Sequence, residues 1–153
     1  MVSDAKGINH AKLWRPDPEV DISLFKARFT TFTYDRHTHD EYALGVICQG
    51  MQRFHHKGSL HDAQPCSIIS VNPDEVHDGM AATKDGYFYR MLYVGLPYLE
   101  HAFQDLFPGT GLRAFSAPVT TDPELGQRLA QAMEQLLLPV LYELFSRHAS
   151  PNM

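Results

Sequence analysis

The chain has 153 residues, of which 44% are hydrophobic, 11% aromatic and 20% charged, which is the length and composition of one globular domain. Its 18 acidic residues outnumber 13 lysines and arginines, and the formal net charge of −5 excludes a segment that binds nucleic acid by itself. Two cysteines, Cys48 and Cys66, exclude a disulfide framework and a four-cysteine zinc site. The apolar runs are shorter than the ~18–20 residues of a membrane span, and the first residues lack a secretory signal, so we expect a soluble cytoplasmic protein with no membrane partner.

The first part of the chain combines a polar start with a β-rich region. Residues 1–21 have no regular period, and Pro16 and Pro18 exclude a continuous helix, so we predict an N-terminal arm. From residue 22 to about residue 94, short aromatic and β-branched runs alternate with turn-forming clusters, and we expect one mainly β domain over residues 22–118 that includes the short helix described below. We predict strands at residues 24–33, 42–49, 52–56, 66–71 and 87–94. Many short strands without long helices between them indicate a mainly β antiparallel sandwich or barrel.

The pattern becomes helical after Gly95. We predict a short helix at about residues 97–107, followed by a helical segment over residues 119–153. Within that segment Asp122 has the chemistry of a helix N-cap and Pro123 suits the first turn. Pro139 cannot donate an intrahelical hydrogen bond, so we expect two helices, at residues 123–137 and 139–148.

An apolar stripe runs along these two predicted helices at spacings of three and four. Its members are Leu125, Leu129, Met133, Leu136, Val140 and Leu144. The stripe either packs on the β-rich region or contacts a second copy of the chain. Because further leucines widen it to a second apolar face, we favour a homodimer with the stripe at its interface.

Five of the nine histidines fall between Tyr34 and His61. On an extended chain His37, His39 and Glu41 project to one face, because side chains alternate along a strand. His77 follows a predicted tight turn far downstream. Two histidines at i and i+2 with a third from a paired strand could converge on a divalent metal, with or without a carboxylate.

The predicted strand at residues 87–94 has one face with Tyr89 and Met91 and another with Arg90. A guanidinium in this position needs a partner. Either Arg90 pairs at the surface, or it recognises an anionic ligand through the two parallel hydrogen bonds that a carboxylate accepts.

The histidine segments resemble the two signature segments of the cupin jelly roll. His37, His39 and Gly50 match the first segment, and Gly58, Pro65 and His77 match the second. Two positions depart from the pattern, because Ala43 or Leu44 stands at the usual carboxylate and Cys66 at the usual glycine. The resemblance implies a cupin-type double-stranded β-helix followed by the two C-terminal helices, and a three-histidine set without its usual glutamate.

The longer ordered series is more specific. Phe-Thr-Thr-Phe, His-x-His-Asp-Glu-Tyr, Leu-Gly-Val-Ile, Asn-Pro-Asp-Glu-Val-His-Asp-Gly and Tyr-x-Tyr-Arg-Met-Leu-Tyr follow one another between residues 29 and 93. This series resembles the N-terminal effector-binding and dimerisation domain of AraC/XylS-type transcriptional regulators. The resemblance is strong over residues 22–95 and extends to the predicted helices at residues 123–148.

The resemblance implies a non-enzymatic domain that binds a small-molecule effector and dimerises, with DNA contacted only through a C-terminal helix-turn-helix domain that this chain lacks. Tyr89 and Met91 match the positions that contact the ligand in a sugar-responsive member. The expected effector pocket comprises His37, His39, Glu41, His77, Tyr89, Arg90 and Met91. No cofactor is required, although His37, His39 and His77 could hold a divalent metal. The alternative is a small metal-dependent cupin enzyme, a dioxygenase or isomerase, that uses these three histidines.

Overall fold

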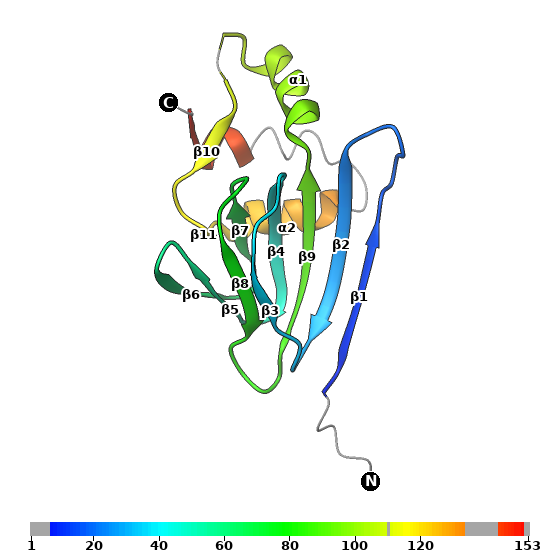
Figure 1. Cartoon of the computed structure of the whole chain (residues 1–153), viewed down its shortest axis with the longest axis vertical. Coiled ribbons are helices and arrows are strands. Elements are labelled where there is room, and N and C mark those ends of the chain that lie inside the picture. Colours follow the sequence, from blue (N-terminus) through cyan, green and yellow to red (C-terminus); the bar gives the residue numbers. More distant parts are fainter. Residues whose placement is uncertain (1–6, 110, 134–143, 152–153) are drawn as a thin grey trace.

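The computed structural model describes residues 7–109, 111–133 and 144–151, which form two antiparallel sheets facing each other and helices at one end and on one outer face (Figure 1). The large sheet has the strand order β1 (Asn9–Trp14), β2 (Ile22–Phe29), β9 (Tyr87–Val94), β4 (Tyr42–Gly50), β7 (Ser67–Val71) and β11 (Val119–Thr121). The small sheet has the order β3 (Tyr34–His37), β8 (His77–Ala81), β5 (Gln52–His56) and β6 (Ser59–Ala63). A separate strand pair joins β10 (Arg113–Phe115) to β12 (Ala149–Pro151), and the helices are α1 (Leu96–Leu106) and α2 (Pro123–Ala132).

The large sheet has a different core on each of its two faces. Along β4 and β9, alternate residues such as Leu44 and Leu92 join a core with α1 and α2. Their neighbours, such as Ala43 and Tyr89, join a second core that includes side chains of the small sheet. The period-two alternation of these strands therefore assigns one face to helix packing and the other to the space between the sheets.

A close approach between β4 and β9 requires glycine at position 45. Gly45 lies opposite Met91 in the register of the two strands. A Cβ atom at residue 45 would overlap both the Met91 thioether and the carbonyl oxygen of Arg90. The missing side chain thus leaves room for Met91 between the sheets.

The predicted β strands agree with the structure where alternation was strong. The strands at residues 52–56 and 87–94 are confirmed as β5 and β9, and those at 42–49 and 66–71 differ from β4 and β7 by one residue at one end. The strand predicted at residues 24–33 runs from Ile22 to Phe29 instead. The Thr30 amide still donates to the Ile8 carbonyl oxygen, but the amides of Thr31 and Phe32 donate to the Asn9 side chain instead of continuing the ladder.

The N-terminal segment contains a strand that we did not predict. Residues 9–14 of the predicted arm form β1, which pairs along its whole length with β2, from Asn9 opposite Phe29 to Trp14 opposite Leu24. All but Trp14 are exposed, so the strand carries no buried alternation in its sequence. Backbone pairing with β2, hydrogen bonds to the Asn9 side chain and the contact of Trp14 with the core place this part of the arm in the large sheet.

The helices begin as predicted. Helix α1 differs by one residue from the prediction, and α2 begins at Pro123 with the Asp122 carboxylate accepting a hydrogen bond from the Leu125 amide at 3.2 Å. Helix α2 ends at Ala132, with Met133 as its C-cap, so the predicted end at residue 137 is wrong. The break at Pro139 and the start of the next helix lie outside the described residues. Residues 144–148 are helical. No helix among the described residues is long and apolar enough to cross a membrane.

The apolar stripe packs on the sheet of its own chain. Leu125, Leu129, Met133 and Leu144 are each at most 5% exposed and belong to the core under the large sheet, where α2 contacts β4 and β7. The prediction that these four side chains form a dimer interface is therefore wrong. Leu136 and Val140 lie outside the described residues.

Candidate functional site

A cavity of about 60 Å³ lies between the two sheets. A buried water needs roughly 10–15 Å³ on this measure, so the cavity has room for a ligand of a few non-hydrogen atoms. Its lining combines apolar side chains with hydroxyl, amide and imidazole groups. The lining residues are Tyr34, His37, His39, Gln52, Phe54, Ile69, Val71, His77, Asp78, Tyr89, Met91 and Tyr93.

Three histidines converge at one side of this cavity. His37 ends β3, His39 follows two residues later, and His77 begins β8 directly opposite His37 in the ladder. Their ring centroids are 4.4 Å apart for His37 and His77, 4.8 Å for His37 and His39, and 5.2 Å for His39 and His77. One ring nitrogen of each lies within 4.8 Å of the others. The sequence prediction that these three side chains meet is confirmed.

Backbone carbonyls fix the tautomer of two of the three rings. His37 Nδ1 lies 2.6 Å from the carbonyl oxygen of Asp35, and His77 Nδ1 lies 2.9 Å from that of Glu75. A carbonyl oxygen only accepts, so both Nδ1 atoms carry the proton and donate it. In the neutral rings the Nε2 lone pairs therefore stay available to a donor or to a metal.

The surroundings favour the neutral form of His39 and His77. Burial lowers the pKa of His39 to about 4, helped by the nearby His77 and His37 and opposed by Asp40. Burial likewise lowers the pKa of His77, against the effect of its hydrogen bond to Glu75. At neutral pH both rings are uncharged and offer a hydrogen-bond acceptor.

Tyrosine hydroxyls supply the polar groups deeper between the sheets. The Tyr34 and Tyr89 hydroxyl oxygens are 3.0 Å apart, and the Tyr93 ring lies 5.1 Å from that of His39. Burial raises the pKa of Tyr34, Tyr89 and Tyr93, so all three hydroxyls remain protonated donors. No lysine or arginine of the described residues lines the cavity. The one lining carboxylate, Asp78, accepts hydrogen bonds from the amide and Nδ1 of His55.

Glu41 does not join the three histidines. The strand ends at His37 and the chain bends at Asp40 and Glu41, so the alternation used to place Glu41 fails. Its carboxyl is instead near Asp21 and Asp40, and its pKa is raised first by burial and then by these two charges. The expectation that Glu41 lines the pocket is corrected.

Arg90 lies on the opposite face of β9 from the cavity. Its strand neighbours Tyr89 and Met91 line the cavity, as expected from the resemblance, whereas Arg90 shares the other face with Phe88 and Leu92. Its guanidinium carbon is 5.7 Å from the centroid of the Phe88 ring. The prediction of Arg90 as a pocket residue is therefore wrong, and with it the reason to expect an anionic ligand.

Several lining residues were missed from the sequence. Gln52 and Phe54 alternate inward from the correctly predicted β5, and Ile69 and Val71 do so from β7. Strict alternation within these two strands was the signal that could have found them. Tyr34 had no such signal, because β3 has only four residues and its pairing with β8 is irregular.

The donor set fits a divalent metal in part. A tetrahedral ion with metal–nitrogen bonds of about 2.1 Å needs nitrogens about 3.4 Å apart, which modest rotation of the three rings would provide. The carbonyl hydrogen bonds to His37 and His77 are the outer contacts that orient metal-bound imidazoles. Among the described residues no carboxylate completes the group, so His37, His39 and His77 alone would hold the ion.

Comparisons with known structures place the fold. A cupin 2 conserved barrel domain protein from Salinispora arenicola is 13% identical, with 63% of this chain and 84% of that chain covered and a TM-score of 0.52. The cupin domain of an XRE family transcriptional regulator from Enterobacter cloacae is 14% identical, covering 56% and 95%, at 0.50. Oxalate decarboxylase from Bacillus subtilis is 16% identical at 0.51, covering 57% of this chain and 25% of that one. These likenesses confirm a cupin barrel.

A search of curated protein sequences gave no match. The family model described as the AraC-like ligand binding domain matches residues 19–151, which include the small sheet, every strand of the large sheet except β1, the cavity and the C-terminal helical part. The chain therefore belongs to the AraC-like ligand binding domain family, on a cupin-type fold.

Proposed function

We propose that the chain is the sensing domain of an AraC-type transcriptional regulator and that a small-molecule effector binds in the cavity between the sheets. The observation that carries the proposal is the convergence of three imidazoles and two tyrosine hydroxyls on one partly apolar cavity. Such a mixture of apolar walls and a few directed polar groups is typical of small-molecule sites. Family membership supports the same role.

The lining favours an uncharged effector. A carboxylate or phosphate in the cavity would find no lysine or arginine among the described lining residues, and burying an unpaired charge is costly. A hydroxyl or N–H group would instead donate to Nε2 of His77 or to the unprotonated ring nitrogen of His39 and accept from the tyrosine hydroxyls. The effector class that fits is a small neutral molecule with hydroxyl or amide groups.

Thermal-shift and calorimetric titration test this proposal with neutral hydroxyl and amide compounds and their matched carboxylates. A ligand at a hundred times its Kd stabilises the folded state by about 2.7 kcal/mol, which raises Tm measurably. Tyr89→Phe removes one cavity hydroxyl and keeps the ring, so affinity should fall roughly tenfold, as expected for one lost hydrogen bond. Tyr98→Phe, outside the cavity, is the control. Ligands that bind both variants equally would contradict the cavity as the site.

The output we propose is allosteric. The ligand would shift the balance between two conformations of the domain, and this requires different affinities for the two. We propose that the regulator acts in the cytoplasm as a homodimer and contacts DNA through a helix-turn-helix domain outside this chain. The dimer contacts would then lie away from the four buried residues of the stripe. Sedimentation of the chain measures its oligomeric state, and a strict monomer would contradict the dimer.

A metal-dependent enzyme is the second candidate, favoured by the three histidine nitrogens within 4.8 Å of one another. A divalent ion held by His37, His39 and His77 would supply Lewis-acid chemistry at the mouth of the cavity. Metal analysis of the purified protein and of a His39→Phe variant tests this alternative. One ion per chain, lost in the variant, together with turnover of a substrate, would replace the sensing proposal. Protein that retains no metal after incubation with Zn²⁺ or Mn²⁺ would exclude the enzyme.

A further inference from the structure

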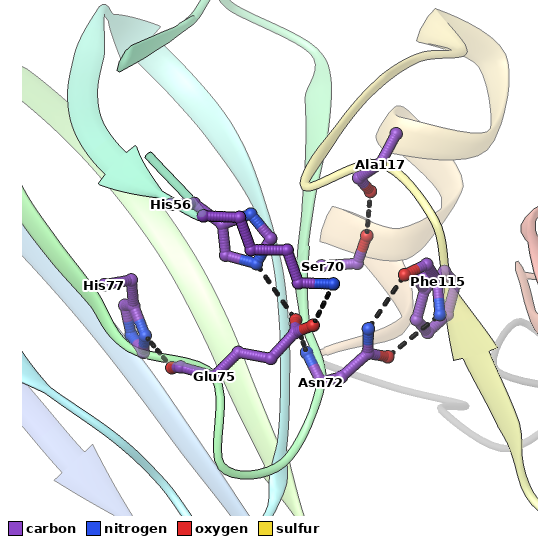
Figure 2. A network of polar contacts seen from close by, with 8 residues as sticks. His56, Ser70, Asn72, Glu75, His77, Phe115 and Ala117 are labelled. Atoms are coloured by element: carbon purple, nitrogen blue, oxygen red, sulfur yellow. Dashed lines mark hydrogen bonds and ion pairs between the residues drawn. The ribbon is translucent and has the colours of Figure 1, made fainter. Parts of the chain in front are cut away.

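The turn between β7 and β8 lies between the cavity and the C-terminal strand pair, which we define as β10 with β12. This β7–β8 turn comprises residues 72–76, and His77 follows it directly. Figure 2 shows hydrogen bonds leaving the turn in two directions, from Glu75 towards His77 and His56, and from Asn72 towards Phe115.

On the cavity side, the turn holds a histidine of the candidate site. His77 Nδ1 donates to the Glu75 carbonyl oxygen at 2.9 Å. Three donors hold the Glu75 carboxylate, namely His56 Nε2 at 3.0 Å, Lys57 Nζ at 2.8 Å and the backbone N–H of Asn72 at 3.1 Å. The side chains of Glu75 and His56 are 16% and 5% exposed, so their contact is largely shielded from water, whereas the Lys57 side chain is exposed. A displacement of His77 therefore acts on a residue with little freedom to absorb it.

On the other side, the Asn72 side chain binds the backbone of β10. Its Nδ2 donates to the Phe115 carbonyl oxygen at 2.8 Å, and its Oδ1 accepts from the Phe115 amide at 2.9 Å. Asn72 is 9% exposed, and replacement of these bonds by water would require the segment to open. The pair of bonds reproduces, with a side chain, the exchange that two residues make in a β ladder.

Phe115 is also the contact between this turn and β12. Phe115 lies opposite Ala149 in the register of β10 and β12. Its ring is 4.8 Å from that of Phe145, in the helical turn that precedes β12. Figure 1 shows β10 and β12 beside each other at the end of the molecule that also carries α1.

The two hydrophobic cores do not provide this connection. The apolar and tyrosine residues of the cavity belong to the core between the sheets, whereas Phe115 and Phe145 belong to the core on the opposite face of the large sheet. The hydrogen bonds of the β7–β8 turn pass around the end of the sheet and join the two sides.

We propose that the β7–β8 turn couples the cavity to the C-terminal strand pair, with Asn72 and Glu75 as positioning residues that act through His77 and Phe115. This inference rests on the proposed function in one respect, namely that the event that changes His77 is the binding of a ligand that contacts it. The coupling itself is a property of the chain, because a change at His77 alters the support of Glu75 and Asn72 and thereby the pairing of β10 with β12.

A double-mutant cycle read by hydrogen exchange tests the coupling without a ligand. The variants of the full chain are His77→Ala, Asn72→Ala and the double variant, and the readout is exchange in peptides covering residues 112–118 and 144–151. His77→Ala should speed exchange in both peptides roughly threefold to tenfold, the effect of one lost hydrogen bond. In the Asn72→Ala background the same change should have no further effect on these peptides.

Two matched variants separate coupling from general destabilisation. Asn9→Ala removes an asparagine that likewise accepts from backbone amides, those of Thr30, Thr31 and Phe32, at the far end of the large sheet. It should speed exchange near residues 30–33 and leave residues 112–118 unchanged. His77→Asn keeps a donor near the position of Nδ1 but removes Nε2, so the two C-terminal peptides should exchange as in the native chain while any ligand or Zn²⁺ at the cavity binds more weakly.

If His77→Ala leaves the C-terminal peptides unchanged, or accelerates them equally with and without Asn72, the coupling is wrong. The coupling is also wrong if His77→Ala accelerates hydrogen exchange equally throughout the molecule. Should Asn72→Ala fail to fold, Asn72→Asp replaces it, because Asp retains the acceptor for the Phe115 amide and loses the donor. If a ligand binds the cavity but the effects of His77→Ala and Asn72→Ala simply add, the coupling is wrong and the proposed function stands. If the two effects do not add but no ligand binds, the coupling stands and the proposed function is wrong.

Discussion

Replacing Leu129 by alanine tests whether the apolar stripe of α2 stabilises its own chain. Leu129 is fully buried in the core where α2 packs on β4 and β7. Truncation of a buried leucine removes its transfer free energy and leaves a cavity, which costs about 2–5 kcal/mol. For a chain of this size, a loss of 3 kcal/mol lowers Tm by roughly 6–12 °C.

Urea unfolding at two widely separated protein concentrations provides the measurement. Trp14 is the single tryptophan and packs against the same core, so its fluorescence reports loss of this packing. Gln131→Ala, on the exposed face of α2, is the matched control and should change the free energy of unfolding by less than about 0.5 kcal/mol. A loss below about 1 kcal/mol for Leu129→Ala would refute the packing argument. The argument would also be refuted if the urea midpoint rose with protein concentration for the native chain but not for Leu129→Ala, because the stripe would then act between chains.

Three further predictions concern the site and its supports. Burial lowers the pKa of His39 to about 4, so between pH 6.5 and 4 this side chain binds more protons in the unfolded chain than in the folded one. The free energy of unfolding should therefore fall as the pH is lowered through this range, and it should fall less steeply in His39→Gln. The prediction is contradicted if urea unfolding gives both proteins the same dependence of this free energy on pH. Gly45→Ala should cost at least about 1–3 kcal/mol through overlap with Met91 and the Arg90 carbonyl, whereas Gly111→Ala, which meets open space, should be nearly neutral in the same assay. Asp122→Ala removes the cap of α2 and the partner of Arg147 and His148, so it should cost about 1–2 kcal/mol, and Asp122→Asn should recover most of the capping part when both are compared by thermal unfolding.

The strands that were predicted correctly are those with a buried face. Burial alternates residue by residue along β5 and along β9 as far as Met91, and both strands lie between punctuating turns. The strands β6 and β8 were missed because Ser-Leu-His-Asp-Ala and His-Asp-Gly-Met-Ala have few β-forming residues. The strand β6 forms a hairpin with β5 across Lys57 and Gly58, so the turn was a local signal for it, whereas the pairing of β8 with β5 is a long-range property that no local pattern contains.

The histidine cluster could be predicted because two of its members are neighbours in sequence and the third follows a recognisable turn. Glu41 was misplaced because the alternation assumed a strand that stops at His37. Arg90 was included for its chemistry although its position in the alternation already placed it on the other face. The network around Asn72 and Glu75 depends on the return of residues 113–119 to the end of β7, which the sequence pattern did not indicate.

The division of the large sheet into two faces has a consequence for how such a domain can diversify. The face under α2 supplies a dense apolar core, while the face towards the small sheet supplies the cavity. Most of the free energy of folding comes from residues that the cavity side chains do not contact, so substitutions in the cavity leave that contribution unchanged. Ligand preference can thus drift through exchanges of residues such as Tyr34, Gln52 or Met91 while the architecture persists. This arrangement suits a family of ligand-binding domains that share one scaffold and differ in the side chains of the cavity.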